Sequence, residues 1–519
     1  MNLNFTPPTR PLLGACLLLA PLLSHGQTLP GRAVLTGHIS GSTTDSVAVA
    51  LRGGPLAADE QLIRVPVTGK GDFQLTIPLV GSTLADLVYG DDVVPLFLDP
   101  GTDLDVRFKG TAMSTTIRFK ANDMPAAGPG HKQRNSSDLT EQQRHRQQAA
   151  NANNYLSEFD IQFVENDAFQ ALPGNIKLYE APFASFLEHR RKREIEFLEE
   201  HAARLPFTQE FYHYAHAEVV YSYANDKLTF QDLRQQVVYT EGRLHLAADY
   251  YSFLREPGLL NEPSAAQSEV YHEFLLNYVR FAVGQASHQP ADTDFYPACY
   301  ALAAEQLTGP VKALVLGRIL RESFRLGHLK QSAAMLADFR SYDPQNQYYP
   351  ALLSSFDQYK DFSIGAPAPD FQLTSATGDT VRLRDFAGKL VYLSFWKSTN
   401  GLSLRNLAYI QELMCQFAGK NIVFVSVALD ENEQSWKALV NSKSLPGVQL
   451  RAAGGLGAAT ALAYALQAVP SCFLIGEDGT FLNTRPKRLG GRAAVDEISQ
   501  SFGKAGTYTG TLDLVATKK

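Results

Sequence analysis

The chain has 519 residues, of which 45% are hydrophobic, 19% are charged and 10% are aromatic. This composition is that of a folded protein and excludes a disordered chain, and a single hydrophobic core stops growing near about 300 residues, so we expect two or three domains. The formal net charge is −6 and no long basic stripe carries interleaved aromatic residues, which argues against a nucleic-acid partner.

The first residues have the features of an export signal. Arg10 supplies a positive charge, residues 12–23 form a short apolar run, and residues 24–26 offer a cleavage site with small residues. We therefore expect residues 1–26 to be a signal peptide. The mature protein would then be exported to the periplasm or the cell envelope.

A lipid anchor is an alternative reading of the same segment. The stretch Leu13-Gly14-Ala15-Cys16 resembles a lipoprotein box, which would attach the mature chain to a membrane through Cys16. The apolar run continues beyond Cys16, whereas a lipobox cysteine ends such a run, so we favour cleavage after Gly26. Because no other stretch reaches the roughly 20 apolar residues of a membrane span, we expect no transmembrane segment in the mature chain.

Residues 27–121 have the period-two pattern of β-strands. Apolar and polar residues alternate in runs such as 47–51, 73–77 and 104–108, and turn signals at 53–54, 69–71 and 99–101 separate these runs. Alternation places the apolar side chains on one face of a sheet. We therefore predict a small antiparallel β-sandwich domain.

The next segment, residues 122–150, is mostly polar and is predicted to be a linker that runs into a helix. From residue 151 to residue 362 the apolar residues have helical spacing, as in Val270, Phe274 and Tyr278, and prolines punctuate the pattern. We predict an all-α domain over residues 151–362. No convincing fixed-period repeat supports a solenoid.

Two histidines of this helical region raise the question of a metal site. His213 and His216 could share one helix face, and Glu218 follows closely. A zinc site needs three or four ligands, and no third ligand is evident. We therefore predict no metal site and interpret both histidines as surface or hydrogen-bonded residues.

Residues 363–505 alternate between strand and helix patterns and predict an α/β domain, followed by a C-terminal tail at residues 506–519. Pro367 and Pro369 force extended backbone at its start. The expected strands are 389–396, 421–428 and 471–475, and the expected helices are 402–417 and 433–440.

Four stretches of this domain carry a family resemblance, in the order Pro367-Ala-Pro-Asp-Phe371, residues 378–383, residues 386–396 and residues 469–479. They resemble the thioredoxin-like disulfide reductases of bacterial envelopes, of the cytochrome-maturation type, which are related to the peroxiredoxins. The resemblance implies a thioredoxin-like fold with a cis proline at Pro470 beside the active site.

In active relatives a Cys-x-x-Cys pair stands at the start of the helix that follows the Phe-Trp pair. Here the resemblance places Asn400 and Ser403 at the two cysteine positions. Because disulfide exchange needs a thiolate, the sequence predicts a degenerate catalytic site. Asn400 is then read as a helix N-cap, with a binding groove as the functional alternative. The candidate groove residues are Trp396, Thr399, Asn400, Gly401, Val469 and Pro470.

Cysteines are sparse, and no C-x-x-C motif is present, which excludes a disulfide scaffold and a zinc ribbon. Outside the signal segment they are Cys299, Cys415 and Cys472. Cys472, close to Pro470, and Cys415 are the candidates for a displaced reactive thiol. We favour inert packing for both, and a bridge between them stays open.

Taken together, these features predict an exported, redox-inactive protein that binds or scaffolds a peptide or a protein of the bacterial envelope, with no cofactor. The alternative is a thiol-disulfide oxidoreductase or thiol antioxidant enzyme that uses Cys472 or Cys415. A third hypothesis places the function in the two preceding domains.

Overall fold

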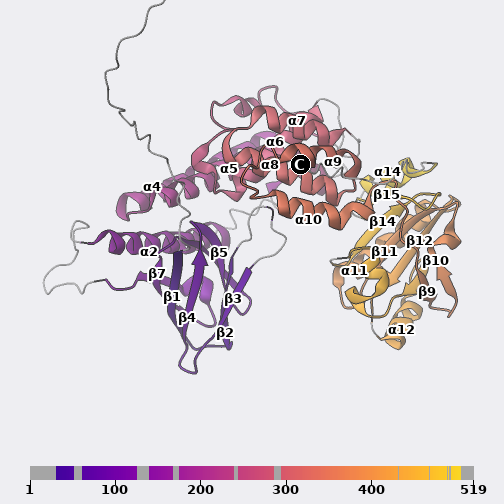
Figure 1. The fold of residues 1–519 in the computed structure, drawn as a ribbon, viewed down its shortest axis with the longest axis horizontal. Helices are drawn as coiled ribbons and strands as arrows, with labels where there is room; N and C mark the ends of the chain where they lie inside the picture. Colours follow the sequence, from indigo (N-terminus) through magenta and orange to yellow (C-terminus); the bar gives the residue numbers. More distant parts are fainter. Residues whose placement is uncertain are drawn as a thin grey trace, which may run out of the picture.

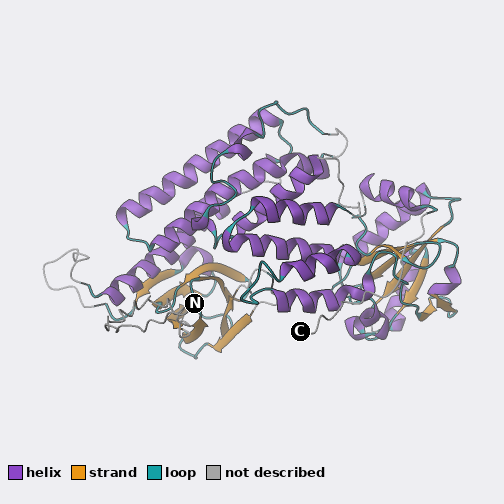
Figure 2. Ribbon diagram, turned by 45° about the horizontal axis from the view of Figure 1, so that its top comes forward, coloured by secondary structure: helices purple, strands orange, loops and turns teal. Residues whose placement is uncertain are grey.

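Three regions follow one another along the chain in the computed structural model: a β region, a helical region and an α/β domain (Figure 1). The helical region lies between the other two (Figures 1 and 2). The predicted signal peptide, with Cys16, and the predicted tail lie outside the described residues. The structure describes residues 31–51, 56, 61–124, 139–166, 175–238, 243–285, 294–430, 432–466, 468–487, 489 and 492–503.

The β region consists of two four-stranded sheets that share one buried apolar cluster. Its elements are β1 Gly31–Ser40, β2 Ser46–Leu51, β3 Gln61–Pro66, β4 Asp72–Leu79, β5 Thr83–Tyr89, β6 Asp92–Leu98, β7 Asp103–Lys109, α1 Met113–Thr116 and β8 Arg118–Ala121. The strand orders are β4-β1-β7-β8 and β3-β2-β5-β6. Alternate residues of β4 are buried, so the period-two pattern does fill the core from one face of each sheet.

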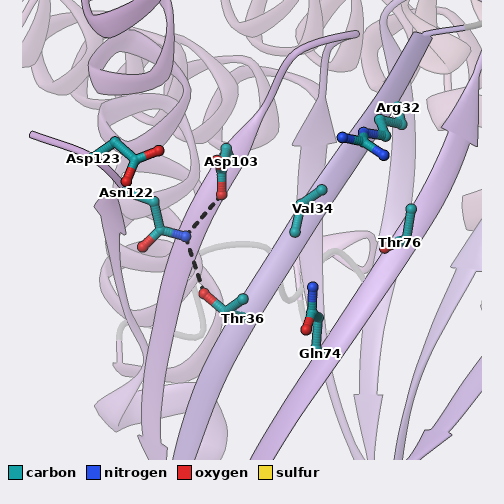
Figure 3. A pocket seen from close by; sticks show the side chains of 8 residues that line it. All are labelled: Arg32, Val34, Thr36, Gln74, Thr76, Asp103, Asn122 and Asp123. Carbon is teal, nitrogen blue, oxygen red and sulfur yellow. Dashed lines mark hydrogen bonds between the residues drawn. The ribbon is translucent and has the colours of Figure 1, made fainter.

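The predicted all-antiparallel arrangement is wrong for one pair of strands. β1 and β7 are parallel, with Val34 beside Asp103 and Ile39 beside Phe108. Parallel and antiparallel strands both place successive side chains on opposite faces, so alternation in the sequence does not report strand direction. The outer face of this sheet carries polar side chains from β1, β4 and β7 (Figure 3).

Helix α2 (Glu141–Phe159) begins inside the segment 122–150, which was predicted to be a linker that runs into a helix. The buried face of α2 is made mostly of small and amide residues, with Tyr155 as its large apolar side chain. Ala149 lies in the β cluster, and the fully buried Asn153 accepts from the Phe97 N–H at 2.9 Å and donates to its carbonyl at 3.0 Å. A helix that docks through amides has no apolar stripe for a sequence pattern to detect.

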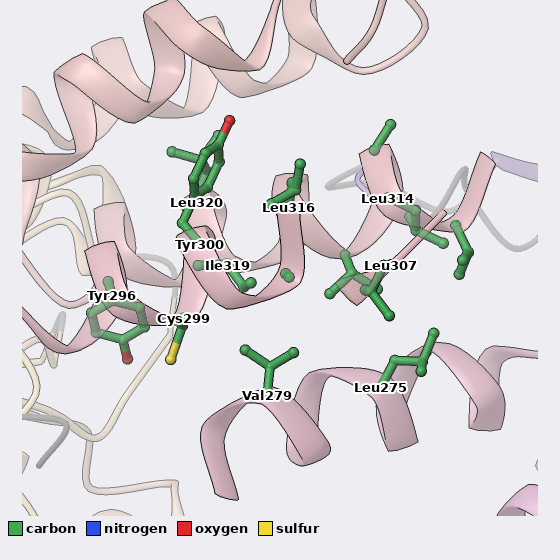
Figure 4. Packing of buried hydrophobic residues seen from close by; sticks show 14 of the residues in the cluster. Leu275, Val279, Tyr296, Cys299, Tyr300, Leu307, Leu314, Leu316, Ile319 and Leu320 are labelled. Atoms are coloured by element: carbon green, nitrogen blue, oxygen red, sulfur yellow. The ribbon is translucent and has the colours of Figure 1, made fainter. Parts of the chain in front are cut away.

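The helical region packs α5 to α10 around one large buried cluster, whereas α4 packs in two smaller clusters. Its elements are η2 Asp160–Asn166, α4 Glu180–Arg204, α5 Gln209–Val237, η3 Ser252–Arg255, η4 Pro263–Ala265, α6 Glu269–Gln285, α7 Phe295–Gln306, α8 Gly309–Arg325, α9 Leu329–Phe339, α10 Tyr349–Tyr359 and η5 Lys360–Phe362. Leu275 and Val279 of α6 face the α7 and α8 residues Cys299 and Ile319 (Figure 4). Among the described residues no helix is long and apolar enough to cross a membrane.

Side chains of the β region are buried in the helical region at two places. Phe97, on β6, packs against Phe211 of α5 with ring centroids 5.2 Å apart. Leu56 is only 5% exposed and lies in the core of the helical region. Gly317 of α8 leaves room for it, since a Cβ at Gly317 would lie 2.5 Å from Leu56 Cδ1.

The α/β domain contains a seven-stranded mixed sheet with the order β10-β9-β13-β12-β11-β14-β15. Its elements are β9 Gln372–Ser375, β10 Thr380–Arg382, η6 Leu383–Phe386, β11 Leu390–Trp396, α11 Gly401–Gln416, β12 Ile422–Ala428, α12 Glu433–Lys443, β13 Val448–Arg451, η7 Gly455–Gly457, α13 Ala459–Ala463, β14 Ser471–Ile475, β15 Phe481–Asn483 and α14 Arg492–Ser501. The strands and helices expected from the sequence are confirmed, with small shifts at their ends. α11, α12 and α14 share one cluster with the interior strand β11.

A short linker, residues 363–371 between η5 and β9, attaches this domain to the helical region. The Ile364 N–H donates to the Gly327 carbonyl at 2.9 Å, and the Gly365 N–H donates to the Phe481 carbonyl at 2.7 Å. The Phe362 ring lies 6.1 Å from the Phe481 ring. The linker is thus hydrogen-bonded to the helical region on one side and to the α/β domain on the other.

Candidate functional site

The candidate site lies at one edge of the α/β sheet. β11 and β12 are parallel, so both end at this edge, and the antiparallel β14 begins there. Phe395 pairs with Ser471, so the segment after β11 and the segment before β14 are neighbours. The Val469–Pro470 peptide bond is cis, as the resemblance implied. Residues 397–401 together with Val469 and Pro470 are called the mouth below.

Asn400 begins helix α11 as its N-cap, which confirms that expectation. Its side-chain oxygen accepts from the Ser403 N–H at 2.8 Å, and its own N–H donates to the Lys397 carbonyl at 3.1 Å. The Ser403 side chain is fully buried, and its hydroxyl has no hydrogen-bond partner among the described residues. At the start of α11 the Asn400 amide is therefore half-buried, and the Ser403 hydroxyl is fully buried.

An acidic residue that the sequence reasoning missed holds the loop before α11. Asp430 is buried just after β12, and its carboxylate accepts from the Ser398 hydroxyl at 2.7 Å. The Ser398 N–H also donates to both carboxylate oxygens, at 3.1 Å each. The sequence signal for this role was an acidic residue that follows the buried strand β12. β12 is the neighbour of β11, the strand that leads into the loop. This pair fixes the loop ahead of any ligand.

The predicted groove residues do not all reach the surface. Thr399 and Gly401 are exposed, and Val469 and Pro470 are half-buried. Trp396 is 0% exposed and packs in the cluster beneath α11, so its inclusion in the groove is corrected. It lies on the face of β11 that packs beneath α11, and a run of consecutive apolar residues does not reveal which face a residue takes.

Cys472 lies on β14 directly opposite Ser394 of β11. It is half-buried in the cluster beneath α11, and its thiol lies 3.6 Å from the Ser394 hydroxyl oxygen. Burial raises the pKa of the Cys472 thiol, although hydrogen bonds with Tyr392 and Ser394 act in the opposite direction. A thiol with a raised pKa is a weak nucleophile at neutral pH, because little of it is thiolate.

The other two described cysteines, Cys415 and Cys299, differ from Cys472 in their exposure to solvent. Cys415 lies at the C-terminal end of α11 and is exposed, which corrects the expectation that it packs inside. Cys299 is buried in the core of the helical region (Figure 4), and burial raises its pKa to about 12. All three thiols are free, so Cys415 and Cys472 are not bridged.

The histidines considered as metal ligands have other neighbours. His216 stacks on Tyr212, with ring centroids 6.2 Å apart and an interplanar angle of 24°. Glu218 accepts from the Ser268 hydroxyl at 2.8 Å. Within the described residues there is no group of three or more His, Cys, Asp or Glu side chains that could hold a metal ion.

Part of the α/β domain is similar to a known protein family. Residues 364–482 match the family model of the AhpC/TSA family. The thiol-disulfide oxidoreductase ResA of Bacillus cereus is 28% identical over 124 residues, which cover 24% of this chain and 70% of that protein. ResA of Oceanobacillus iheyensis is 35% identical over 88 residues, which cover 16% of this chain and 46% of that protein.

Solved structures are similar to about a quarter of the chain. The thioredoxin domain of a thiol-disulfide oxidoreductase from Bacteroides vulgatus has 21% sequence identity and a TM-score of 0.24, and covers 27% of this chain and 96% of that one. A thiol-disulfide oxidoreductase from Bacteroides fragilis has 23% identity and a TM-score of 0.24, and covers 26% of this chain and 98% of that one. The family match and the ResA relatives assign residues 364–482 to the thioredoxin-like AhpC/TSA family, within which the similar proteins are thiol-disulfide oxidoreductases.

Proposed function

We propose that this chain is an exported binding or scaffold protein whose thioredoxin-like domain no longer exchanges disulfides. The observation that carries the proposal is the first turn of α11, where Asn400 caps the helix and Ser403 is buried. The resemblance assigns these two positions to the cysteines of active relatives. An amide and a buried hydroxyl stand there instead.

Disulfide exchange at a helix start depends on sulfur at both positions. Helical N–H groups and the helix dipole lower the pKa of the first thiol, which attacks the disulfide, and the second thiol then resolves the mixed disulfide. The carboxamide of Asn400 is not a nucleophile of this kind. The hydroxyl of Ser403 is out of reach of solvent. Peroxide reduction by the related peroxiredoxin route needs a cysteine at the same helix start and fails for the same reason.

The features that remain at the mouth suit binding. The Asp430–Ser398 pair fixes the loop, and the exposed Thr399 and Gly401 lie next to the half-buried cis proline Pro470. A rigid surface loses little conformational entropy when a ligand binds. A peptide or protein segment of the cell envelope is the partner we propose, on the basis of the export signal at residues 1–26.

The proposal is tested by dithiol-dependent reduction of insulin with the purified mature chain. We expect the same background rate from the wild type and from a Cys299→Ala/Cys415→Ala/Cys472→Ala variant. An Asn400→Cys/Ser403→Cys variant serves as the matched positive control, because it restores the cysteine pair on the same scaffold. Wild-type turnover clearly above the cysteine-free variant overturns the proposal.

The alternative, an oxidoreductase that uses Cys472 or Cys415, meets two physical objections. Burial raises the pKa of Cys472. Cys415 lies fifteen residues farther along α11 than Asn400, which is about 22 Å at the helical rise of 1.5 Å per residue. Iodoacetamide at neutral pH should modify Cys415 at the rate of an ordinary exposed thiol and Cys472 only after denaturation. Rapid modification of Cys472 in the folded protein would favour the enzyme.

A further inference from the structure

The outer face of the first β sheet carries a groove that the thioredoxin-like domain does not involve. It has a volume of about 490 Å³, within the range of small-ligand pockets. The groove runs over β1, between β4 on one side and β7 with the segment after β8 on the other (Figure 3). It is called the β1 groove below. Its lining residues are Arg32, Val34, Thr36, Gln74, Thr76, Asp103, Asn122 and Asp123.

One wall of the β1 groove is fixed by hydrogen bonds. The Asn122 amide donates to Asp103 at 2.8 Å and to the Thr36 hydroxyl at 3.0 Å. Arg146 of α2, whose side chain is 14% exposed, pairs with Asp103 at 3.2 Å and with Asp123 at 3.0 Å. These polar groups are therefore held in place before any ligand arrives.

The other wall presents polar side chains that have no partner of their own. Arg32, Gln74 and Thr76 make no side-chain hydrogen bond or ion pair within the described part of the chain, and all three are exposed. They project from β1 and β4 into the same space as Asn122 (Figure 3). Half-buried Val34 lies between the walls and offers a small apolar floor.

The charges of the groove select against ionic ligands. Arg32 and Arg146 are balanced by Asp103 and Asp123, so the site has no net charge. An anion attracted to Arg32 would be repelled by the carboxylates of Asp103 and Asp123 across the groove. A cation would find both carboxylates already paired with Arg146. A neutral ligand avoids both penalties.

Strand geometry also excludes a peptide that adds to β1, and one that adds to the edge strand β4 would lie on the side of β4 away from β1. β1 is hydrogen-bonded to β4 on one side and to β7 on the other, so its backbone has no open edge here. Recognition must come from side chains. Guanidinium, amide and hydroxyl groups supply donors and acceptors on rigid strands, and a ligand that carries many hydroxyl groups can use them together.

We propose that the β1 groove binds a neutral, hydroxyl-rich ligand of the size of a mono- or disaccharide. The side chains of Arg32, Gln74, Thr76 and Asn122 bond to its hydroxyl groups, and a C–H face of the sugar ring lies on Val34. This site is independent of the function proposed for the mouth.

The test uses saturation-transfer NMR and titration calorimetry on the mature chain with maltose, cellobiose and N,N′-diacetylchitobiose. At least one of these sugars should bind. A Gln74→Ala/Thr76→Ala variant should weaken that binding about tenfold or more, because two hydrogen bonds are lost. The matched control is Arg107→Ala, which removes an exposed side chain from the same face of β7 outside the groove.

Three outcomes overturn the proposal: none of the three sugars gives a signal, the double variant binds as the wild type does, or Arg107→Ala weakens binding equally. Glucose 6-phosphate, glucosamine and their neutral analogue glucose complete the panel. Tighter binding of either one than of its neutral analogue would overturn the assignment to a neutral ligand. Circular dichroism of each variant checks that the sheets remain folded.

Discussion

The β region and the α/β domain are attached to the helical region in different ways. The β region inserts side chains: Phe97 packs on Phe211, and Leu56 fills the space beside Gly317. The α/β domain is attached at its linker, whose backbone bonds reach Gly327 on one side and Phe481 on the other, and the Phe362 side chain beside the linker is buried in the α/β core. The β region thus shares buried side chains with α5 and α8, far from the chain connection, whereas the α/β domain is joined beside its linker and keeps clusters of its own.

This difference predicts two unfolding units, one made of the β and helical regions and one made of the α/β domain. Both tryptophans of the chain, Trp396 and Trp436, are buried in the α/β domain. Tryptophan fluorescence, excited at the red edge where the 22 tyrosines do not absorb, therefore reports on that domain alone, while far-UV circular dichroism reports on all regions. Denaturant titrations followed by both signals should give different midpoints. Coincident curves in every variant below would show a single cooperative unit.

The largest effect is expected for Phe97→Ala. Removing this fully buried ring between the β region and α5 should cost about 3–5 kcal/mol of the unfolding free energy of the first unit. The circular dichroism transition should move to lower denaturant while the fluorescence transition stays. Val93→Ala, at a 53% exposed position of the same strand, is the control and should change little. An equal shift of both signals would contradict the comparison.

A smaller effect is expected where Leu56 meets Gly317. Leu56→Ala should destabilise the first unit by about 2–3 kcal/mol, because it empties a buried site. Gly317→Ala in that background should recover about 1 kcal/mol, since alanine favours the helix and its methyl group enters the vacated space. In the wild type the same change places a Cβ 2.5 Å from Leu56 Cδ1 and should not stabilise. Additive effects in the double-mutant cycle would show that the two residues do not interact.

The fold could be predicted where the pattern is local and long. The strand at 471–475 and the helices of the α/β domain follow from consecutive residues. Short strands such as β10 (Thr380–Arg382) span too few residues for a period to appear. The parallel pairing of β1 with β7 and the docking of α2 through Asn153 depend on contacts between distant residues. No local pattern encodes them.

The candidate site shows the same division. The Asn400 cap is a local signal and could be predicted, whereas the Asp430–Ser398 pair joins two loops that meet only in the folded sheet. Cys415 was expected inside because apolar residues surround it in sequence. At 100° per residue it points away from the buried Ile410 on the same helix, and it is exposed.

Within the α/β domain, a stabilising change is expected at Ser403. Its buried hydroxyl has no partner among the described residues, so Ser403→Ala should raise the stability of this domain by about 1–2 kcal/mol. Ser435 occupies the matching position of α12, three residues after the N-cap Asn432, but is exposed. Ser435→Ala should therefore change stability by only about 0.5 kcal/mol. The fluorescence transition measures both, and an equal effect at the two sites would contradict the role of burial.

The smallest effect separates capping from a second role for Asn400. Asn400 and Asn432 cap α11 and α12 in the same way, accepting from N–H groups at 2.8 and 2.9 Å. If Asn400 only caps, Asn400→Ala and Asn432→Ala should each cost about 1 kcal/mol in the fluorescence transition, and Asn400→Asp should preserve the cap. A clearly smaller cost at Asn400 would mean that its side chain is not placed for stability. That result would indicate a side chain placed for a ligand, because residues that serve binding often give up stability.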